Sequence, residues 1–368
     1  MLGFVVFAII VSILIIAHEF GHFLAARRAG IRVEKFAIGF GPVLMSLKRG
    51  DLEFLIRLVP LGGYVKMAGD IRSQCQGRSF EFFSRSVGTR TKIIFFGPLF
   101  NYLLAMMIFW IVFMVGFPYP DTFIGAVKED SPAQKVGILQ GDKILQINNK
   151  KVGNWIEVSD SITDSEGTVE IMLLRNGKVI SFELTPQEQE ATSIFGQAIK
   201  RKMIGIASSD KIKIVRENVF VALYKGIKRT FTLTAFMIKG IAYTIMGKIS
   251  VREAIAGPVA IYYVTSEMAK VGVVAVLVLM GSLSVSLTIV NLIPLPVLDG
   301  GHLLFLFLEK IRRRPLTEKT EDILTRVGIA ILFFLVVVVF YNDIYRFGPK
   351  ILGREGQTPG GQSQTTEP

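Results

Sequence analysis

The sequence has few of the residues on which secreted and soluble proteins usually depend. Of 368 residues, one is cysteine, three are histidine and 20% are charged, whereas ordinary globular chains carry about 25% charge. The single cysteine, Cys75, excludes an internal disulfide and any CxxC metal or redox motif. The shortage of charge, beside 51% hydrophobic residues, excludes intrinsic disorder for most of the chain and a purely soluble enzyme.

The charge that is present is mostly basic, with a formal net charge of +12. In a chain this apolar, excess lysine and arginine more often flank membrane spans and face anionic lipid than bind nucleic acid. We therefore expect a lipid bilayer, and no nucleic acid, among the partners of this protein.

Four stretches almost free of charge predict transmembrane helices. The first covers about residues 2–29 and the second about 92–118; the third lies within 271–308, where Asp299 is the one charged residue, and the fourth covers about 323–342. These lengths approach or exceed the roughly 20 residues that a bilayer requires. The first stretch has no basic leader and no small-residue cleavage site, which argues against a signal peptide.

Segment 210–270 is also apolar, but lysines and arginines interrupt it so often that we predict amphipathic helices lying at the membrane interface. Between Arg27 and Lys92 there are 13 basic against 5 acidic residues. The positive-inside rule therefore places this stretch and the basic 303–326 loop in the cytoplasm, with both termini outside.

Residues 121–209 alternate polar and apolar positions, which predicts a β-rich domain inserted between the second span and the amphipathic segment. Within them, Ser131–Lys150 contains a helix start, a glycine stop, a Gly-Asp turn and a strand pattern. Strand patterns at 168–174 and 178–184 flank Arg175-Asn-Gly-Lys178, a strong hairpin signal. The SPAxxxG…GDxIxxIN pattern resembles a PDZ domain of the type attached to bacterial proteases, and the alternative is a small domain without a ligand.

Two polar motifs interrupt the apolar stretches. Residues 18–22 read His-Glu-Phe-Gly-His. On a helix, His18 and His22 share one face, so both imidazoles can bind one metal ion, and Glu19 is placed to take a proton from an attacking water. Chance produces such a motif here on the order of once in a thousand sequences. The alternative is two histidines hydrogen-bonded in a helical core, although ionisable groups within a membrane are usually functional.

A catalytic zinc ion requires a third protein ligand. The stretch Asn291-Leu-Ile-Pro-Leu-Pro-Val-Leu-Asp-Gly-Gly-His302 offers Asp299 and His302, and spacing alone does not choose between them. If the first and third spans both run inward, Asp299 lies at the same depth as the HExxH motif. That condition requires segment 210–270 to stay at the membrane surface.

A β-hairpin is predicted over residues 34–69, because two alternating runs flank the Arg49-Gly-Asp51 turn. It contains Gly39, Gly41, Gly62 and Gly63, and glycines within strands mark places where backbone approaches something closely. Gly39-Phe-Gly41 is not a nucleotide-binding loop, since the third glycine and the following helix are missing.

Together, HEFGH near the N-terminus, the NLIPLPVLDGGH stretch and the PDZ-like pattern between them resemble the site-2 protease family of zinc intramembrane metalloproteases, most closely those of the RseP type. The resemblance extends over residues 1–347. It implies a membrane α-helical fold of four spans, a membrane-associated β-hairpin and one extracytoplasmic PDZ domain. A relative in this family carries two PDZ domains in tandem, whereas residues 187–217 are too short here for a second.

The resemblance also implies roles for single residues. His18, His22 and Asp299 would bind Zn²⁺, with Glu19 as the catalytic base. Asn291 would contact substrate, as would the hairpin glycines, which are Gly39, Gly41, Gly62 and Gly63. His302 and Asn101, the asparagine of a Gly97-Pro-Leu-Phe-Asn101 element similar to the family's GPxxN, would lie around the metal ligands.

The expected activity is zinc-dependent endopeptidase cleavage within the transmembrane segments of single-pass membrane proteins, such as anti-sigma-factor-like or signal-peptide-like substrates, after another protease has trimmed them. We expect a multi-pass protein of the bacterial inner membrane, an active site towards the cytoplasm, and peptide ends or a periplasmic partner at the PDZ domain. The rival hypotheses are a membrane-anchored zincin that digests soluble peptides and a non-enzymatic PDZ scaffold; a transporter is disfavoured because no inverted repeat is evident. The glycine- and glutamine-rich segment 348–368 is expected to be a disordered tail.

Overall fold

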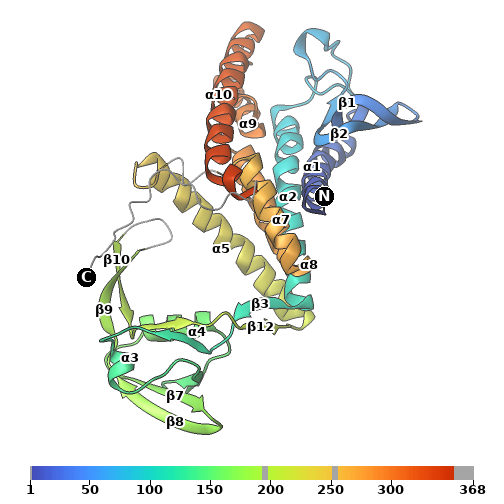
Figure 1. The fold of residues 1–368 in the computed structure, drawn as a ribbon. Helices are drawn as coiled ribbons and strands as arrows, with labels where there is room; N and C mark the ends of the chain where they lie inside the picture. The colour runs from blue at the N-terminus through green and yellow to red at the C-terminus, as the bar shows by residue number, and fades with distance from the viewer. Residues whose placement is uncertain (1, 193–197, 251–255, 352–368) are drawn as a thin grey trace. The chain divides into compact units, whose positions relative to one another are not determined.

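The computed structural model describes residues 2–192, 198–250 and 256–351. Residues 348–351 belong to a helix, so the predicted start of the disordered tail at 348 is wrong, and the rest of that tail lies outside the described residues. The chain forms two compact units (Figure 1). The first consists of Met1–Trp110, Leu223–Ala242 and Ser250–Pro368, and the second of Ile111–Ala222 and Tyr243–Ile249. The first unit is mainly helical with one long hairpin, and the second is rich in short strands.

Four helices are long and apolar enough to cross a bilayer, as the sequence predicts. They are α1 (Leu2–Arg28), α2 (Val87–Val115), α8 (Val273–Asn291) and α10 (Glu318–Ile351). Most side chains in their apolar stretches are not buried within the chain. Large exposed apolar surfaces of this kind are typical of contact with lipid.

The predicted third span is present as α8, but the apolar run 271–308 is divided between two helices, and Asp299 lies beyond the end of that span. Helix α8 ends at Asn291, a turn follows, and α9 occupies Asp299–Arg312. Pro294 and Pro296 lie in the turn, where each lacks the N–H that a helix interior requires. The break makes Asp299 the first residue of α9.

The predicted hairpin is present as β1 (Val33–Arg49) and β2 (Leu52–Met67), shown beside α1 in Figure 1. Its strands are strongly bent, because residues 35–38 pair both with residues 53–56 and with residues 63–66. Gly39 and Gly41 have positive φ angles of 85° and 84°, which L-residues with a side chain rarely adopt. The far part of the hairpin exposes a series of large apolar side chains, including Phe40, Leu44, Met45, Leu47 and Leu58.

Segment 210–270 was predicted to form amphipathic helices throughout. This prediction is wrong for its first residues, because Ile212–Val215 form strand β12. Helices α5 (Val219–Ile245) and α7 (Pro258–Val271) follow. Helix α5 is not among the helices apolar enough to span a membrane, as the sequence argument requires. Helix α7 packs against α1, with the rings of Phe7 and Tyr262 edge to face at 6.1 Å.

The second unit is built around a four-stranded sheet of order β6-β5-β7-β8. Its strands are β5 (Lys143–Ile147), β6 (Lys150–Lys151), β7 (Val169–Arg175) and β8 (Lys178–Leu184). The predicted turn between β7 and β8 has positive φ at Asn176 and Gly177, as a type I′ hairpin requires. Ser131 caps the short helix α3 (Pro132–Lys135) by accepting from Gln134 N–H.

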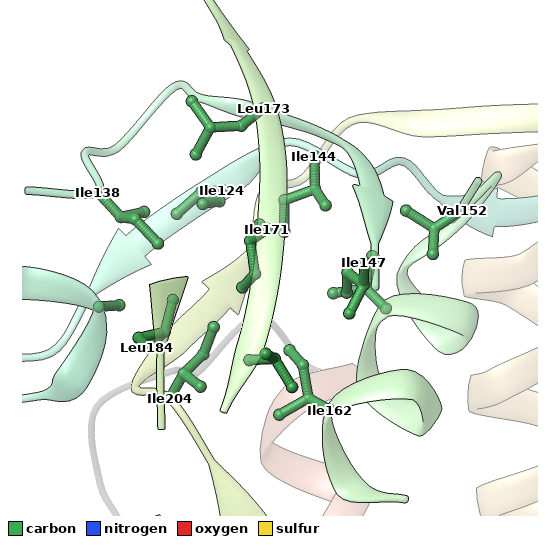
Figure 2. Close-up of a cluster of buried hydrophobic side chains, with 13 residues drawn as sticks. Ile124, Ile138, Ile144, Ile147, Val152, Ile162, Ile171, Leu173, Leu184 and Ile204 are labelled. Carbon is green, nitrogen blue, oxygen red and sulfur yellow. The ribbon is translucent and has the colours of Figure 1, made fainter. Parts of the chain in front are cut away.

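Helix α4 (Trp155–Thr163) and the remaining strands complete this unit. Strands β4 (Ile124–Val127) and β11 (Ile206–Ser208) form one pair, β3 (Phe117–Pro120) and β12 a second, and β9 (Gln187–Thr192) and β10 (Ala198–Met203) a third. Isoleucine, leucine and valine side chains from the sheet, α4 and the 204 region meet in one buried cluster (Figure 2). The residues after 187 therefore contribute to the core of this same unit.

Candidate metal centre

Three of the predicted site residues meet in the first unit. His18 Nε2 and His22 Nε2 lie 3.3 Å apart, and Asp299 Oδ2 lies 3.1 Å from the first and 3.4 Å from the second. All three side chains are at most 16% exposed. In the described part of the chain they form the one group of three or more histidine, cysteine or acidic residues able to share a metal ion.

This triangle of atoms fits a zinc ion. With zinc–ligand bonds of about 2.0–2.1 Å, a tetrahedral site separates its ligand atoms by about 3.3 Å, which agrees with the three measured separations. Asp299 Oδ2 is buried and accepts no hydrogen bond of good geometry in the described residues. Two imidazoles and one carboxylate also suit zinc chemically, and they leave a fourth position open.

The close approach of α1 and α2 places His22. A Cβ atom on Gly21 would overlap the Phe96 carbonyl, and one on Gly97 would overlap the His22 ring, so both helices need glycine where they meet. His22 Nδ1 lies 3.0 Å from Ile93 O. Because a carbonyl only accepts, Nδ1 carries the proton and Nε2 keeps the lone pair that a metal requires.

The turn between α8 and α9 places Asp299. The first turn of α9 contains Gly300 and Gly301, and a Cβ atom on either would overlap carbonyl groups of residues 292–295. Because Gly300 and Gly301 have no side chain, the turn between α8 and α9 can pack directly against the first turn of α9. The structure therefore brings Asp299, and not His302, into the cluster with the two histidines.

Glu19 lies where the hairpin meets α1. A Cβ atom on Gly63 would be 3.1 Å from Glu19 Cγ and 3.0 Å from Ile15 Cγ2. The nearest neighbours of Gly39, Gly41 and Gly62 instead belong to the hairpin itself. Of the four glycines predicted to contact substrate, Gly63 is thus the one that approaches the HExxH helix.

Of the remaining predicted site residues, Asn101 is close to the histidines, whereas Asn291 and His302 are outside the three-residue cluster. Asn101 is completely buried on α2, and its Nδ2 lies 3.4 Å from His18 Nδ1. Asn291 is the half-buried last residue of α8. His302 is exposed on the first turn of α9 and lines a cavity of about 770 Å³.

Charged side chains surround that cavity. Arg90 donates two hydrogen bonds to Glu309, and Arg72 lies 3.2 Å from Glu321. These pairs join the first turn of α2 and the loop after β2 to α9 and α10. They hold the far end of the helix that begins with Asp299.

Several residues around the site were not singled out from the sequence. Gly21 and the Ile93 carbonyl set the position of His22, while Ser284 and Thr288 on α8 donate to the Asn101 and Pro98 carbonyls of α2. The signal available was the presence of small and hydroxyl residues in apolar helices, which marks helix contacts in membranes. It does not say which helix is the neighbour.

A second cavity, of about 410 Å³, lies in the second unit between α4 and the 201–207 segment. Its charged lining residues are Lys128, Arg201 and Lys202, with no acidic residue among those that line it. Arg201 reaches across to α4, where it donates to Thr163 Oγ1 and Ser159 Oγ.

Comparisons with known proteins show the family of this chain. The sequence profile of peptidase family M50 matches residues 6–335. This chain belongs to that family, the site-2 proteases. The zinc metalloprotease RasP of Oceanobacillus iheyensis is 29% identical over 423 residues, which cover 93% of this chain and 98% of that protein. RasP of Geobacillus kaustophilus is 29% identical over 420 residues, covering 93% and 97%.

A further relative, from Campylobacter jejuni, is 33% identical over 346 residues that cover 93% of both chains. Among solved structures, the PDZ domain of an SdrC-like protein from Listeria monocytogenes is 26% identical and matches 25% of this chain and 90% of that chain, with a TM-score of 0.20. As a member of peptidase family M50 with zinc metalloproteases among its relatives, the protein is a zinc metalloendopeptidase.

Proposed function

We propose that this protease hydrolyses peptide bonds inside the membrane, with zinc held by His18, His22 and Asp299. The observation that carries the proposal is the buried triangle of ligand atoms on α1 and α9, because α1 is apolar enough to span a bilayer. A metal centre on such a helix meets its substrate in lipid. A zincin acting on soluble peptides would instead need its ligands on a helix exposed to water.

The chemical steps follow from the groups at the centre. Bound zinc supplies a Lewis acid that polarises the scissile carbonyl and makes water a better nucleophile. Glu19, next to His18 in the sequence, takes a proton from the attacking water and then passes a proton to the leaving amine. His22 stays neutral and oriented through its hydrogen bond to the Ile93 carbonyl.

The hairpin supplies the place for an unwound substrate. A transmembrane helix hides its peptide carbonyls in i to i−4 hydrogen bonds, so it must unwind before water can attack. An unwound segment in lipid needs new partners for its backbone. The edge of β2 near Gly63 lies beside Glu19, and strand addition there would satisfy the substrate backbone close to the metal. Asn291 remains a candidate for a further substrate contact.

Substrates of this kind are single-pass membrane proteins, and we propose that another protease trims them first. The second unit, which we assign as an extracytoplasmic PDZ domain, would receive peptide ends. Its cavity supports this assignment, since Lys128, Arg201 and Lys202 suit a terminal carboxylate and the edge of β11 suits an extended chain. The Arg201 bonds to Ser159 and Thr163 would have to open as the peptide enters.

We further propose that the protein is a multi-pass protein of the bacterial cytoplasmic membrane with its active site towards the cytoplasm. The basic residues between Arg27 and Lys92 support this orientation through the positive-inside rule. The exposed apolar side chains of the β1–β2 hairpin support contact between the hairpin and lipid.

The decisive experiment uses a single-pass membrane reporter without its outer domain, incubated with the wild-type protein or with Glu19→Gln. We expect cleavage by the wild type alone, abolished by a zinc chelator, with the new terminus inside the membrane span of the reporter. Cleavage outside the span would favour the zincin alternative. Equal cleavage by Glu19→Gln would remove Glu19 as the base, and binding of partners without any cleavage would favour a scaffold.

The trimming requirement is tested with a deletion of residues 121–209. If the second unit excludes substrates that still carry a large outer domain, the deletion variant cleaves an untrimmed reporter that the wild type leaves intact. The trimmed reporter is the control for folding, because both proteins should cleave it. An active deletion variant that still rejects the untrimmed reporter would contradict the filter.

A further inference from the structure

The two histidines at the metal centre differ in the partner of their second ring nitrogen. His22 Nδ1 faces the Ile93 carbonyl, which can only accept. His18 Nδ1 faces the carboxamide of Asn101 at 3.4 Å, and this group can present either an N–H₂ donor or an oxygen acceptor. The orientation of the Asn101 carboxamide must therefore be chosen from the tautomer that His18 needs in order to bind a metal ion.

Only one orientation of this carboxamide suits a metal ligand. If its N–H₂ group donated to His18, the lone pair of the neutral ring would lie on Nδ1 and the proton on Nε2. That proton would point at Asp299 Oδ2 and His22 Nε2, where the ion has to bind. If the carboxamide oxygen faces His18, Nδ1–H donates to it and Nε2 presents its lone pair.

The surroundings of Asn101 hold it in place for such a role. Its side chain is completely buried, so water does not compete for the hydrogen bond to His18. Its main-chain carbonyl accepts from Ser284 Oγ at 2.7 Å, and one turn earlier the Pro98 carbonyl accepts from Thr288 Oγ1 at 3.2 Å. Two hydroxyl groups of α8 thus fix this part of α2.

We infer that Asn101 is a positioning residue whose carboxamide oxygen accepts Nδ1–H of His18 and thereby fixes the tautomer and ring orientation of this metal ligand. The inference rests on the metal centre proposed above. According to this inference, Asn101 increases the affinity for zinc by orienting His18, and it does not contact the substrate.

The test compares Asn101→Asp, which keeps an acceptor in nearly the same shape, with Asn101→Leu, which removes it. The full-length variants in detergent are stripped of metal, and zinc is titrated back in competition with a chromophoric chelator. Loss of an outer hydrogen-bond partner weakens metal binding by about 10–100-fold, so we expect this loss for Asn101→Leu. Asn101→Asp should bind zinc at least as tightly as the wild type, because a carboxylate only accepts.

A matched control is Thr230→Val, which also removes a completely buried polar group from the first unit. Among the described residues, the Thr230 hydroxyl donates to Gly226 O of its own helix and to no other group. The zinc affinity of this variant should equal that of the wild type. Substitution by Co²⁺ adds a second readout, since the visible spectrum of the Asn101→Asp protein should keep the intensity of a tetrahedral site.

Two results would overturn the inference. One is wild-type zinc affinity in Asn101→Leu, and the other is affinity in Asn101→Asp reduced tenfold or more. The second result decides the matter even if Asn101→Leu does not fold. A wild-type protein that binds no zinc, or a His18→Ala variant that binds it equally well, would instead reject the metal centre on which the inference rests.

Discussion

Gly97 and His22 occupy adjoining space, since a Cβ atom at position 97 would overlap the imidazole ring. The ring lies against the backbone of α2 and donates to Ile93 one turn before this glycine. The position of His22, which we propose as a metal ligand, therefore depends on the absence of a side chain at position 97 of α2.

Gly97→Ala should displace His22 and weaken zinc binding by tenfold or more, although alanine is the better helix former by about 1 kcal/mol. The affected group is the imidazole ring of His22 and not the flexible end of a long chain, so the clash is not relieved cheaply. The measurement is zinc affinity by chelator competition, together with cleavage of the membrane reporter.

Gly88 provides the matched control on the same helix. A Cβ atom there has no neighbour within 4 Å, so Gly88→Ala should leave zinc affinity unchanged. Equal zinc affinity in Gly97→Ala and Gly88→Ala would show that α2 can move away from His22, and that the contact does not position the ligand.

For the buried ion pair of Arg90 and Glu309, we expect replacement of one partner to cost more stability than replacement of both. Their side chains are 5% and 13% exposed. Arg72 Nη2 also lies 4.0 Å from Glu309, so Arg90→Met leaves this carboxylate with one more distant cation. Breaking a buried ion pair costs up to about 3–5 kcal/mol, whereas replacing both partners by apolar residues is often close to neutral. We expect Arg90→Met to lower the thermal unfolding temperature in detergent and the double variant with Glu309→Leu to regain most of it. Additive losses in the two single variants would contradict this coupling.

Asp343 on α10 caps α7, because its carboxylate accepts from the N–H groups of Gly257 and Ala260. It is 1% exposed. Asp343→Leu should destabilise the first unit by about 0.5–2 kcal/mol, the usual range for a lost helix cap. Asp322 lies on the same helix but is exposed and pairs only with Arg326 in the described contacts. Asp322→Asn should therefore leave thermal stability in detergent nearly unchanged, and a loss equal to that of Asp343→Leu would count against the cap.

Local sequence patterns were sufficient to predict the two histidines of the proposed metal site, but not to choose its third residue. The HExxH spacing predicts that His18 and His22 share a helix face, since that geometry depends on five residues alone. The choice between Asp299 and His302 depends on where α9 begins. Pro294 and Pro296 indicate a break, but the close packing of Gly300 and Gly301 on the preceding turn is a tertiary fact.

The second unit shows the same limit. The hairpin around Asn176-Gly177 is confirmed because its turn chemistry is local. Helix α4 was not predicted, although Asn154 and Glu157 form a cap that is visible in the sequence, with Asn154 Oδ1 accepting from Glu157 N–H and Glu157 accepting from Gly153 N–H. A helix of nine residues is stabilised mainly by packing, so its short pattern was not sufficient for a prediction.

The second unit should also lose stability in acid through Asp142. Burial alone would raise the pKa of this carboxyl, but hydrogen bonds from the Arg175 guanidinium and from Leu139 N–H hold its pKa below the ordinary value. The folded unit therefore binds a proton at Asp142 less readily than the unfolded chain does. The stabilisation is complete above the unfolded pKa of about 4 and is lost as the pH falls through the lower pKa of the folded state.

Asp142→Asn should consequently destabilise this unit at pH 7 by about 1–3 kcal/mol, the cost of buried hydrogen bonds that lose their partner. The difference in free energy of unfolding between the variant and the wild type should shrink as the pH falls below about 4. Trp155 packs against the core of the unit, so its fluorescence in a Trp110→Phe background reports unfolding of the full-length protein. Glu183→Gln, at an exposed position on β8, controls for the loss of one negative charge and should be neutral at pH 7. A difference between Asp142→Asn and the wild type that stays constant from pH 7 to below pH 4 would mean that the ion pair with Arg175 does not stabilise the fold.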